Sequence, residues 1–387
     1  MLRVLTLATL FPNGLRPTLG VFVERQTRAL AARPDVEVRV VAPVGLPAWP
    51  LSLSPHYAPL RGLPLCEDWN GLRVHRPRYR VWPKFGTAGT ARRMAAALLP
   101  VLREIRAGFP FDVIDAEFFW PDGPAALQLS QALDVPFSIK ARGSDIHVWG
   151  IRPDTGPQIL AAGRKADGLL AVSGAIREDM IALGMSAEAI RVHHTGLDLD
   201  AFKPVDRAAA KTALGVSGPL LVTAGGLSVR KGQDLAIEAL KEIPGATLIL
   251  AGDGPDRARF EALAKALPVR FLGVRPHAEL PGLLAAADVM VLPTVSEGLA
   301  NVWVEALACG TPVVTTDVGG APEVIDRPAF GRLVPRDPAA IAAAVNAILA
   351  DPPAQEAVRE GALRFNWERN GAELAEHLRG LVKNRSG

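Results

Sequence analysis

The sequence contains little cysteine: Cys66 and Cys309 are the only two, and they lie far apart along 387 residues. This spacing excludes a disulfide framework or a zinc site made of cysteines, and it favours a reducing cytoplasm. A charge excess is also missing, since 43 lysines and arginines stand against 40 acidic residues, so we expect no nucleic-acid partner. Apolar runs that approach the roughly 20 residues needed to span a bilayer are absent too. We therefore expect a cytoplasmic protein, with peripheral attachment to the inner face of a membrane left open.

A secretion signal and a metal site are equally hard to find. Residues 1–11 have a short apolar core, one early charge at Arg3 and no clean cleavage site, which favours a buried first strand. The adjacent His193 and His194 would face opposite ways in a strand, so they do not form a ligand pair. No Asp-x-Asp motif stands in a context typical of a metal site. We therefore expect no metal and no other cofactor.

Apolar strands alternate with helical segments along the whole chain, which is typical of parallel sheets covered on both faces. Two such series in 387 residues predict two doubly wound, Rossmann-like α/β domains. We place them at residues 1–200 and 201–367, with a terminal helix over residues 368–383 that packs back on the first domain. The predicted strands are Val4–Leu10, Glu37–Val41, Val113–Ala116, Phe137–Ala141, Gly168–Val172 and Ile190–His193, then Leu220–Ala224, Ala246–Ala251, Val269–Leu272, Val289–Pro293 and Pro312–Thr315.

The most informative stretch runs from residue 296 to residue 314. Glu297 lies in a Gly-containing loop after a predicted strand, and Glu305 lies eight positions later inside a helix. If Asn301 caps that helix, the free N–H groups of Val302 and Trp303 favour an anion. Eight helical residues span about 12 Å, so the two carboxylates could bracket a sugar, a diphosphate and a ribose. The pattern indicates a nucleotide-sugar site; two solvated glutamates in an ordinary βα unit are the alternative.

This stretch resembles the Glu, seven residues, Glu signature of retaining family 4 glycosyltransferases, which have the GT-B fold of two Rossmann-like domains facing across a cleft. The resemblance covers nearly the whole chain and is strongest over residues 225–320. It implies that Glu297 contacts the donor sugar, with a catalytic role, and that Glu305 hydrogen-bonds the ribose. It also implies a donor-binding role for the residues between them, namely Gly298, Leu299, Ala300, Asn301 and Val302.

A second motif combines a strand, a Gly-Gly turn, two adjacent cations and a helix, over residues 221–234. Cations beside a closely approaching backbone hold a diphosphate and stabilise its charge as it leaves. The motif resembles the family's Gly-Arg-Leu then Lys-Gly pattern, in which Lys231 matches the Lys and Gly226 replaces the Arg. We therefore expect Gly225 and Gly226 to bind the donor, and Lys231 with the neighbouring Arg230 to bind it and act in catalysis. Two exposed cations that merely begin a helix are the alternative.

Two other places in the sequence match the family's donor site. Gly20 stands at the start of the first predicted helix, where family members place a glycine loop against the diphosphate. Val274 follows a strand of the second domain, in the stretch that borders the nucleobase largely through backbone groups. Because backbone groups make those contacts, the sequence does not identify the base.

Candidates for acceptor binding and proton transfer lie in the first domain. Many family members have His-Gly-x-Asp where this chain has Arg142 to Asp145, and Arg142 cannot act as a base. Arg142 could instead bind the sugar, a phosphate or an acidic acceptor, while Asp145 orients it or contacts the acceptor. Glu117 stands at a second place where the family often has His, and could accept a proton. Arg16 could bind an anion; for all four residues a structural role is the alternative.

Residues 43–85 interrupt the alternation with many prolines and with arginines at 73, 76, 78 and 80. A long irregular segment is usually functional or disordered, and tryptophans 49, 69 and 82 argue against disorder. One interpretation is a segment that binds a lipid-linked saccharide or an anionic membrane through Arg76, Arg78 and Arg80. The other is a loop packed on its own domain.

The sequence thus predicts a retaining hexosyltransferase that moves a sugar from a nucleotide-diphosphate-sugar to a saccharide or lipid-linked saccharide in cell-envelope or exopolysaccharide assembly. Two other functions fit the same donor site, because a fold does not fix a reaction. One is a GT-B nucleotide-sugar epimerase. The other is a non-catalytic nucleotide-sugar-binding protein, suggested by Gly226 and Arg142.

Overall fold

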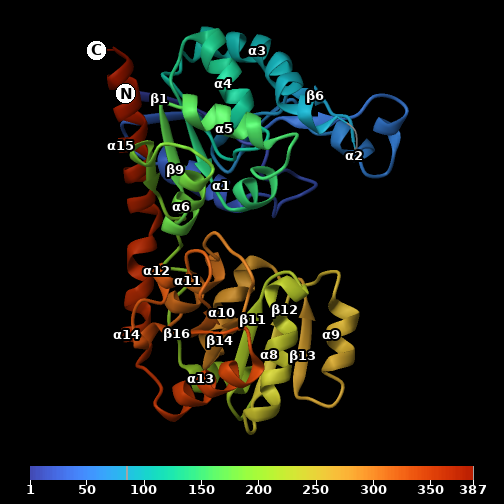
Figure 1. The fold of residues 1–387 in the computed structure, drawn as a ribbon, viewed down its shortest axis with the longest axis vertical. Helices are drawn as coiled ribbons and strands as arrows, with labels where there is room; N and C mark the ends of the chain where they lie inside the picture. The colour runs from blue at the N-terminus through green and yellow to red at the C-terminus, as the bar shows by residue number, and fades with distance from the viewer. Residues whose placement is uncertain (84–85, 387) are drawn as a thin grey trace. The chain divides into compact units, whose positions relative to one another are not determined.

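The computed structural model describes residues 1–83 and 86–386 and divides the chain into two compact units. Unit 1 comprises Met1–Gly196 and Trp367–Gly387, and unit 2 comprises Leu197–Asn366. Each unit is built on one large sheet with helices packed against it, so the predicted α/β fold class is confirmed (Figure 1). Phe85, the last residue of the predicted irregular segment, lies outside the described residues.

The main sheet of unit 1 has eight strands in the order β10-β9-β8-β7-β1-β2-β5-β4. All neighbouring strands are parallel except β4, which is antiparallel to β5. Successive strands are added first on one side of β1 and later on the other, so a topological switch point lies between β1 and β7. The strands are β1 (Leu2–Leu7), β2 (Val36–Val41), β4 (Cys66–Trp69), β5 (Leu72–His75), β7 (Val113–Ala116), β8 (Phe137–Ala141), β9 (Gly168–Ala171) and β10 (Ile190–Val192).

Helices cover both faces of this sheet, and β7, β8 and β9 are buried along their whole length. Strands buried on both faces are recognisable as continuous apolar runs, which explains why β7 and β8 have the predicted bounds. The helices of unit 1 are α1 (Val21–Ala31), α2 (Ala58–Arg61), α3 (Thr90–Gly108), α4 (Asp122–Leu133), α5 (Gly156–Lys165), α6 (Gly174–Ala182) and α15 (Trp367–Ser386).

Helix α15 packs within unit 1 although it follows unit 2 in the sequence. Leu374, Leu378 and Leu381 are buried in one cluster with apolar residues of β1 and β2. The helix approaches α1 closely at Gly371, where an added Cβ would lie 2.6 Å from the carbonyl oxygen of Ala29. The terminal leucines therefore complete the core of the first half of the chain.

Unit 2 contains a six-stranded parallel sheet in the order β13-β12-β11-β14-β15-β16. Its switch point lies between β11 and β14, where ligands bind at the carboxyl ends of the strands in open α/β sheets. The strands are β11 (Leu220–Ala224), β12 (Thr247–Ala251), β13 (Val269–Gly273), β14 (Val289–Leu292), β15 (Val313–Thr316) and β16 (Gly331–Val334). The helices are α7 (Arg207–Ala213), α8 (Gln233–Ala239), α9 (Arg257–Leu263), α10 (Leu280–Ala286), α11 (Asn301–Ala308), α12 (Ala321–Val324), α13 (Pro338–Ala350) and α14 (Gln355–Arg359).

The expectation of an irregular segment over residues 43–85 is wrong. β4 and β5 extend the main sheet, and β3 (Val44–Leu46) pairs in parallel with β6 (Arg78–Arg80) to form a separate small sheet. The arginine cluster is also different from the one predicted. Arg76 is buried, pairs with Glu67 and donates a 2.7 Å hydrogen bond to the carbonyl oxygen of Pro12. Arg78 donates to the carbonyl oxygen of Arg76 at 2.8 Å. These two side chains hold neighbouring loops and do not face an anionic surface.

Asp122, the first residue of α4, is a fully buried carboxyl group of unit 1. Its Oδ2 accepts a 2.9 Å hydrogen bond from the backbone N–H of Thr9. Burial raises the pKa of Asp122 to about 7, and the hydrogen bond from Thr9 opposes that rise only in part. In an unfolded chain the pKa of an Asp is about 3.9. Between about pH 4 and pH 7 the folded protein therefore binds the Asp122 proton more tightly than the unfolded chain does. The contribution of Asp122 to the free energy of unfolding falls as the pH rises through that range.

We predict that Asp122→Asn removes this fall, because Asn keeps an oxygen for Thr9 and carries no charge. The free energy of unfolding of the wild type should drop by up to about 4 kcal/mol relative to the variant between pH 4 and pH 7.5. Urea unfolding followed by tryptophan fluorescence measures it, since six of the seven tryptophans lie in unit 1. Asp351→Asn at an exposed position changes the net charge equally and should keep the wild-type pH profile. Parallel pH profiles for wild type and Asp122→Asn would contradict the prediction.

Candidate functional site

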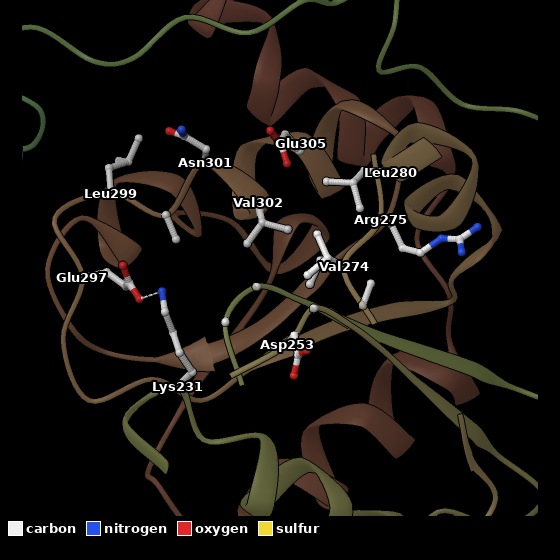
Figure 2. Close-up of a pocket in the computed structure, with 16 residues that line it drawn as sticks. Lys231, Asp253, Val274, Arg275, Leu280, Glu297, Leu299, Asn301, Val302 and Glu305 are labelled. Atoms are coloured by element: carbon white, nitrogen blue, oxygen red, sulfur yellow. Dashed lines mark hydrogen bonds and ion pairs between the residues drawn. The ribbon is translucent and has the colours of Figure 1, made fainter. Parts of the chain in front are cut away.

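A pocket of about 530 Å³ lies in unit 2 at the carboxyl ends of β11 and β12 and the start of α11 (Figure 2). Its size and its place at a switch point are those of a small-molecule site. Many of the residues predicted to bind a donor line it together. The lining residues are Ala224, Gly225, Gly226, Lys231, Ala251, Gly252, Asp253, Val274, Arg275, Leu280, Glu297, Leu299, Ala300, Asn301, Val302 and Glu305.

The floor of the pocket is backbone from the loops after β11 and β12. Gly252 has a φ of +149°, and a Cβ there would lie 1.9 Å from the carbonyl oxygen of Gly225. The N–H of Gly225 donates to the carbonyl oxygen of Ala251 at 2.9 Å. Gln233, fully buried, donates from Nε2 to the carbonyl oxygen of Gly226 at 3.0 Å and so holds the Gly-Gly turn. The turn therefore presents bare backbone to a ligand, as a diphosphate site requires.

Lys231 and Glu297 point toward each other at one end of the pocket, and their side chains form an ion pair (Figure 2). Lys231 comes from the loop after β11, and Glu297 from the loop after β14. The buried Thr294 hydroxyl lies 3.3 Å from the same Glu297 oxygen. Both partners remain partly exposed, at 20% for Lys231 and 14% for Glu297. A ligand can therefore reach a lysine and a carboxylate that are already positioned.

Contacts that the sequence did not indicate join the two loops that carry this ion pair. The N–H of Val295 donates to the carbonyl oxygen of Arg230 at 2.9 Å. Arg336, just beyond the end of β16, donates from Nε to Pro293 at 2.9 Å and from Nη2 to Val229 at 2.7 Å, both at carbonyl oxygens. Its position two residues after a strand of the same sheet was the signal that could have identified it.

The helix that begins at the pocket has a different cap from the one predicted. Asn301 is the first residue of α11 and not its N-cap; Ala300 occupies that position, without a capping side chain. The N–H of Trp303 donates to the carbonyl oxygen of Ala300 at 3.0 Å, so it is not free for a ligand. The N–H groups of Asn301 and Val302 are the ones that lack an intrahelical acceptor. An anion at this helix start would thus meet Asn301 and Val302.

Glu305, one turn into α11, is held by a residue outside the predicted set. Nε2 of His277 lies 2.9 Å from Oε1 of Glu305, which is only 6% exposed. The imidazole ring of His277 packs edge-on against Phe202, with 5.3 Å between ring centroids. His277 therefore fixes which way the Glu305 carboxylate presents its remaining acceptor sites.

Three of the predicted donor-binding residues do not line the pocket. Gly298 is buried behind it, where its carbonyl oxygen accepts a 2.8 Å hydrogen bond from Gly320. Arg230 is 56% exposed and donates to the carbonyl oxygen of Ser296 at 2.7 Å. Its Nη1 nevertheless lies 4.0 Å from Glu297, at the rim. Gly20 belongs to unit 1, at the start of α1.

In unit 1, Glu117 and Arg142 form a buried ion pair with each other, with side chains 1% and 6% exposed. Gln26 donates a hydrogen bond to Glu117, and Nε of Arg142 donates to the backbone carbonyl of Glu117 at 2.9 Å. The Arg142 guanidinium also lies over the ring of Phe22, 4.7 Å from its centroid. The expectation that Glu117 offers an accessible carboxylate is therefore wrong for this structure, because the side chain is buried and already paired with Arg142.

Asp145 is fully buried and faces inward, so the expectation that it contacts an acceptor is also wrong. Its carboxylate accepts hydrogen bonds from the N–H groups of Gly143 at 2.8 Å, Arg142 at 3.0 Å and Phe119 at 3.1 Å. Burial raises the pKa of Asp145, while these donors lower it. Asp145 fixes the loop that carries Arg142, which is the orienting role offered for it as the alternative.

Behind this ion pair lies a buried chain of polar groups that the sequence did not reveal. Nζ of Lys140 donates to Oε1 of Gln26 at 2.6 Å and lies 2.8 Å from Nδ1 of His193. His193 contacts the carbonyl oxygen of Asn370 at 2.9 Å through Nε2. Burial lowers the pKa of Lys140 to about 7 and lowers that of His193 well below its usual range. The chain explains how the protein tolerates several buried ionisable groups: each is bonded to the next.

Gly20 and Arg16 lie on the loop after β1, beside the switch point of unit 1. Gly20 has a φ of +65°, and a Cβ there would lie 2.2 Å from the carbonyl oxygen of Leu10, so no other residue fits. Arg16 is exposed, and its backbone pairs with Asn13 in a tight turn. Arg16 is therefore accessible to an anionic ligand. The backbone geometry at residue 20 is by itself enough to require glycine.

Two family models match the chain, one mainly over unit 1 and one within unit 2. The model described as Glycosyltransferase Family 4 matches residues 19–201, and the one described as Glycosyl transferases group 1 matches residues 218–351. Among solved structures, sucrose-phosphate synthase from Thermosynechococcus elongatus superposes with a TM-score of 0.80 at 23% identity, over 99% of this chain and 100% of that one. Anabaena HepE in complex with UDP gives 0.75 at 22%, over 98% and 100%. These likenesses show that the predicted GT-B fold is correct.

Whole-chain relatives agree with the family models. TuaC of Bacillus subtilis (strain 168), a putative teichuronic acid biosynthesis glycosyltransferase, is 29% identical over 358 residues, covering 89% of this chain and 88% of that protein. D-inositol 3-phosphate glycosyltransferase 1 of Catenulispora acidiphila is 30% identical over 339 residues, covering 78% and 81%. The predicted resemblance is therefore confirmed, and the chain belongs to glycosyltransferase family 4.

Proposed function

We propose that the protein is a retaining glycosyltransferase that moves a sugar from a nucleotide-diphosphate-sugar to an acceptor hydroxyl. The observation that carries this proposal is the Lys231–Glu297 ion pair at one end of a pocket whose floor is glycine backbone. Glu305, one turn into α11, lines the same pocket. The diphosphate would lie between Lys231 and the N–H groups of Asn301 and Val302. The ribose would meet Glu305, and the sugar would meet Glu297.

The chemistry then follows from charge. As the bond between the anomeric carbon and the diphosphate oxygen breaks, negative charge grows on the departing phosphate. Lys231 and the amides at the start of α11 would lie beside that oxygen, and such preorganised groups can stabilise the developing charge without a metal ion. The acceptor hydroxyl attacks on the face that the diphosphate leaves, which retains the configuration, and its proton passes to the departing phosphate oxygen. Arg230, at the rim, supplies a second cation.

The names of relatives suggest the substrates to try first. HepE has been solved with UDP and with UDP-glucose, so UDP-sugars are the first donors. TuaC is named for teichuronic acid biosynthesis, which favours a saccharide or lipid-linked saccharide of the cell envelope as acceptor. In unit 1 the exposed Arg16 is the candidate for an anionic group of that acceptor. The reaction would take place in the cytoplasm.

Incubating the purified protein with UDP-, GDP- and ADP-sugars, with and without saccharide acceptors, tests the function. We expect slow hydrolysis without acceptor and transfer with it, and NMR of the product should show the anomeric configuration of the donor. An epimerised sugar nucleotide would indicate the GT-B epimerase instead. Stabilisation by a nucleotide-sugar in thermal unfolding, without turnover under any condition, would indicate the non-catalytic sensor that Gly226 and Arg142 suggest.

We predict that Lys231→Ala lowers kcat by about 10²- to 10³-fold, the usual loss when one preorganised donor to a developing anion is removed. Circular dichroism and tryptophan fluorescence should be unchanged, because Lys231 is partly exposed and packs no core. Lys241→Ala, an exposed lysine outside the pocket, is the matched control and should keep full activity. Wild-type turnover by Lys231→Ala with the best donor would remove Lys231 from the mechanism.

We predict that His277→Ala raises the KM for the donor about tenfold while kcat changes little. Loss of a hydrogen bond to a charged group costs about 1.5–3 kcal/mol, and the loss falls on ribose binding, away from the breaking bond. His277→Gln can still donate to Glu305 and should recover most of the affinity. A fall in kcat with an unchanged KM, or equal effects of Ala and Gln, would show that His277 does not act by positioning Glu305.

A further inference from the structure

The apolar side chains that unit 1 exposes beside its small sheet form a surface outside the proposed sites. β3 and β6 are parallel and in register, with Leu46 opposite Arg80, so the chain segments that follow them leave the same end of the pair. Exposed large apolar residues on these segments include Trp49 at 77%, Leu51 at 48%, Leu53 at 52% and Trp82 at 58%. We call these four residues the apolar tip. Figure 1 shows the segment that carries α2 as an extension of unit 1 past β6 and α3.

Two contacts hold the segments of the tip together. The N–H of Val81 donates to the carbonyl oxygen of Leu46 at 3.0 Å. Nη1 of Arg80 reaches the carbonyl oxygen of Pro47 at 3.4 Å, two residues before Trp49. Trp49 and Trp82 therefore follow directly on a joined pair of strands. Large apolar side chains that are this exposed and that follow the same end of a strand pair are candidates for a contact surface.

The sequence around the tip is strongly polarised in charge. Residues 38–103 contain ten lysines and arginines but only two acidic residues, Glu67 and Asp68, for a net charge of +8. The whole chain carries +3, so all remaining residues together carry −5. Glu67 and Asp68 are already paired, with Arg76 and Arg73. The other cations of this region have no carboxylate neighbour in the sequence between residues 69 and 103.

Arg80 and Arg93 form the border of the tip. Nε of Arg93 donates to the carbonyl oxygen of Arg80 at 3.0 Å, and its Nη2 donates to that of Gly86 at 2.6 Å. Gly86 packs on Trp82 so closely that a Cβ at Gly86 would lie 2.3 Å from the Cβ of Trp82. In the described part of the chain neither arginine forms an ion pair with a carboxylate. Their charge is therefore available to an external anion next to the tryptophan.

We propose that the apolar tip and its arginine border bind the surface of an anionic lipid bilayer. Tryptophan is the residue that best suits the boundary between headgroups and acyl chains, and the leucines can enter the same layer. Clustered arginines add attraction to anionic headgroups within a Debye length of the surface. No helix in the described ranges 1–83 and 86–386 is long and apolar enough to cross a membrane, so the contact would be at the surface. The excess of lysines and arginines around the tip favours an anionic bilayer over an uncharged hydrophobic protein partner, because apolar contacts alone would be enough to bind such a partner.

Flotation with vesicles of phosphatidylcholine alone, or with 30% phosphatidylglycerol, tests the proposal on the full chain. We expect binding to the anionic vesicles only, lost in 0.5 M salt and reduced at least tenfold in Trp49→Ser/Trp82→Ser. Tryptophan emission should shift to the blue on binding in the wild type and much less in the variant. Val148→Ser/Ile151→Ser, which removes two exposed apolar residues elsewhere in unit 1, is the matched control and should bind as the wild type does.

Three results would overturn the proposal. These are absence of binding to anionic vesicles, equal binding by the Trp49→Ser/Trp82→Ser variant, and a wild-type dimer that the variant loses while neither binds vesicles. Circular dichroism and the melting temperature of the ligand-free protein should be equal in wild type and variant, which shows that the variant is folded. Because the donor pocket lies in unit 2, failure of the membrane proposal would leave the proposed transferase intact, and the reverse also holds.

Discussion

The close contact between the loop after β11 and the loop after β14 is the constraint on which the site depends. A Cβ on Gly232 would lie 2.2 Å from the carbonyl oxygen of Pro293, and one on Gly319 would lie 1.8 Å from that of Glu297. These distances leave no room for a side chain at Gly232, next to Lys231, or at Gly319, which lies in the loop after β15 and packs against Glu297. The ion pair is thus a consequence of two strand ends that meet at one switch point. Its groups are positioned before any ligand arrives.

Much of the fold was predictable because most strands are buried on both faces. β7, β8 and β11 have the predicted bounds. Continuous runs such as residues 220–224 are easy to recognise as buried strands, because apolar and polar residues do not alternate in them. β3 and β6 were missed because three residues are too short to show any period. The cap of α11 was placed one residue late, because a sequence offers Asn301 as a good cap and does not reveal that Ala300 has extended backbone angles. At this helix start the conformation of the loop, and not the capping preference of the residue type, decides which residue is the N-cap.

The lining of the candidate site was predictable in unit 2, whereas the state of the candidate residues in unit 1 was not. The difference is that the unit 1 residues depend on hydrogen-bond and ion-pair partners that lie far away in the sequence. Lys231 and Glu297 are near neighbours of recognisable glycines, so local sequence identifies them. Glu117 and Arg142 owe their state to each other and to Gln26, which is distant from both in sequence. Burial of a charge depends on partners of that kind, because an unpaired ion is too costly to bury. A motif shows which side chain stands at a position, but only the fold shows whether its charge is already neutralised.

The path of the chain has a consequence for synthesis. Unit 2 is an insertion in unit 1, with Leu197 and Asn366 side by side where the chain leaves and returns. Unit 2 is therefore contiguous and can fold as soon as it has left the ribosome. Unit 1 is translated first yet finished last, because its core lacks Leu374 and Leu378 until α15 emerges. For the time that it takes to make the intervening residues, the apolar residues of β1 and β2 lack these partners, and exposed apolar surface of this kind is what makes incompletely folded chains prone to aggregate.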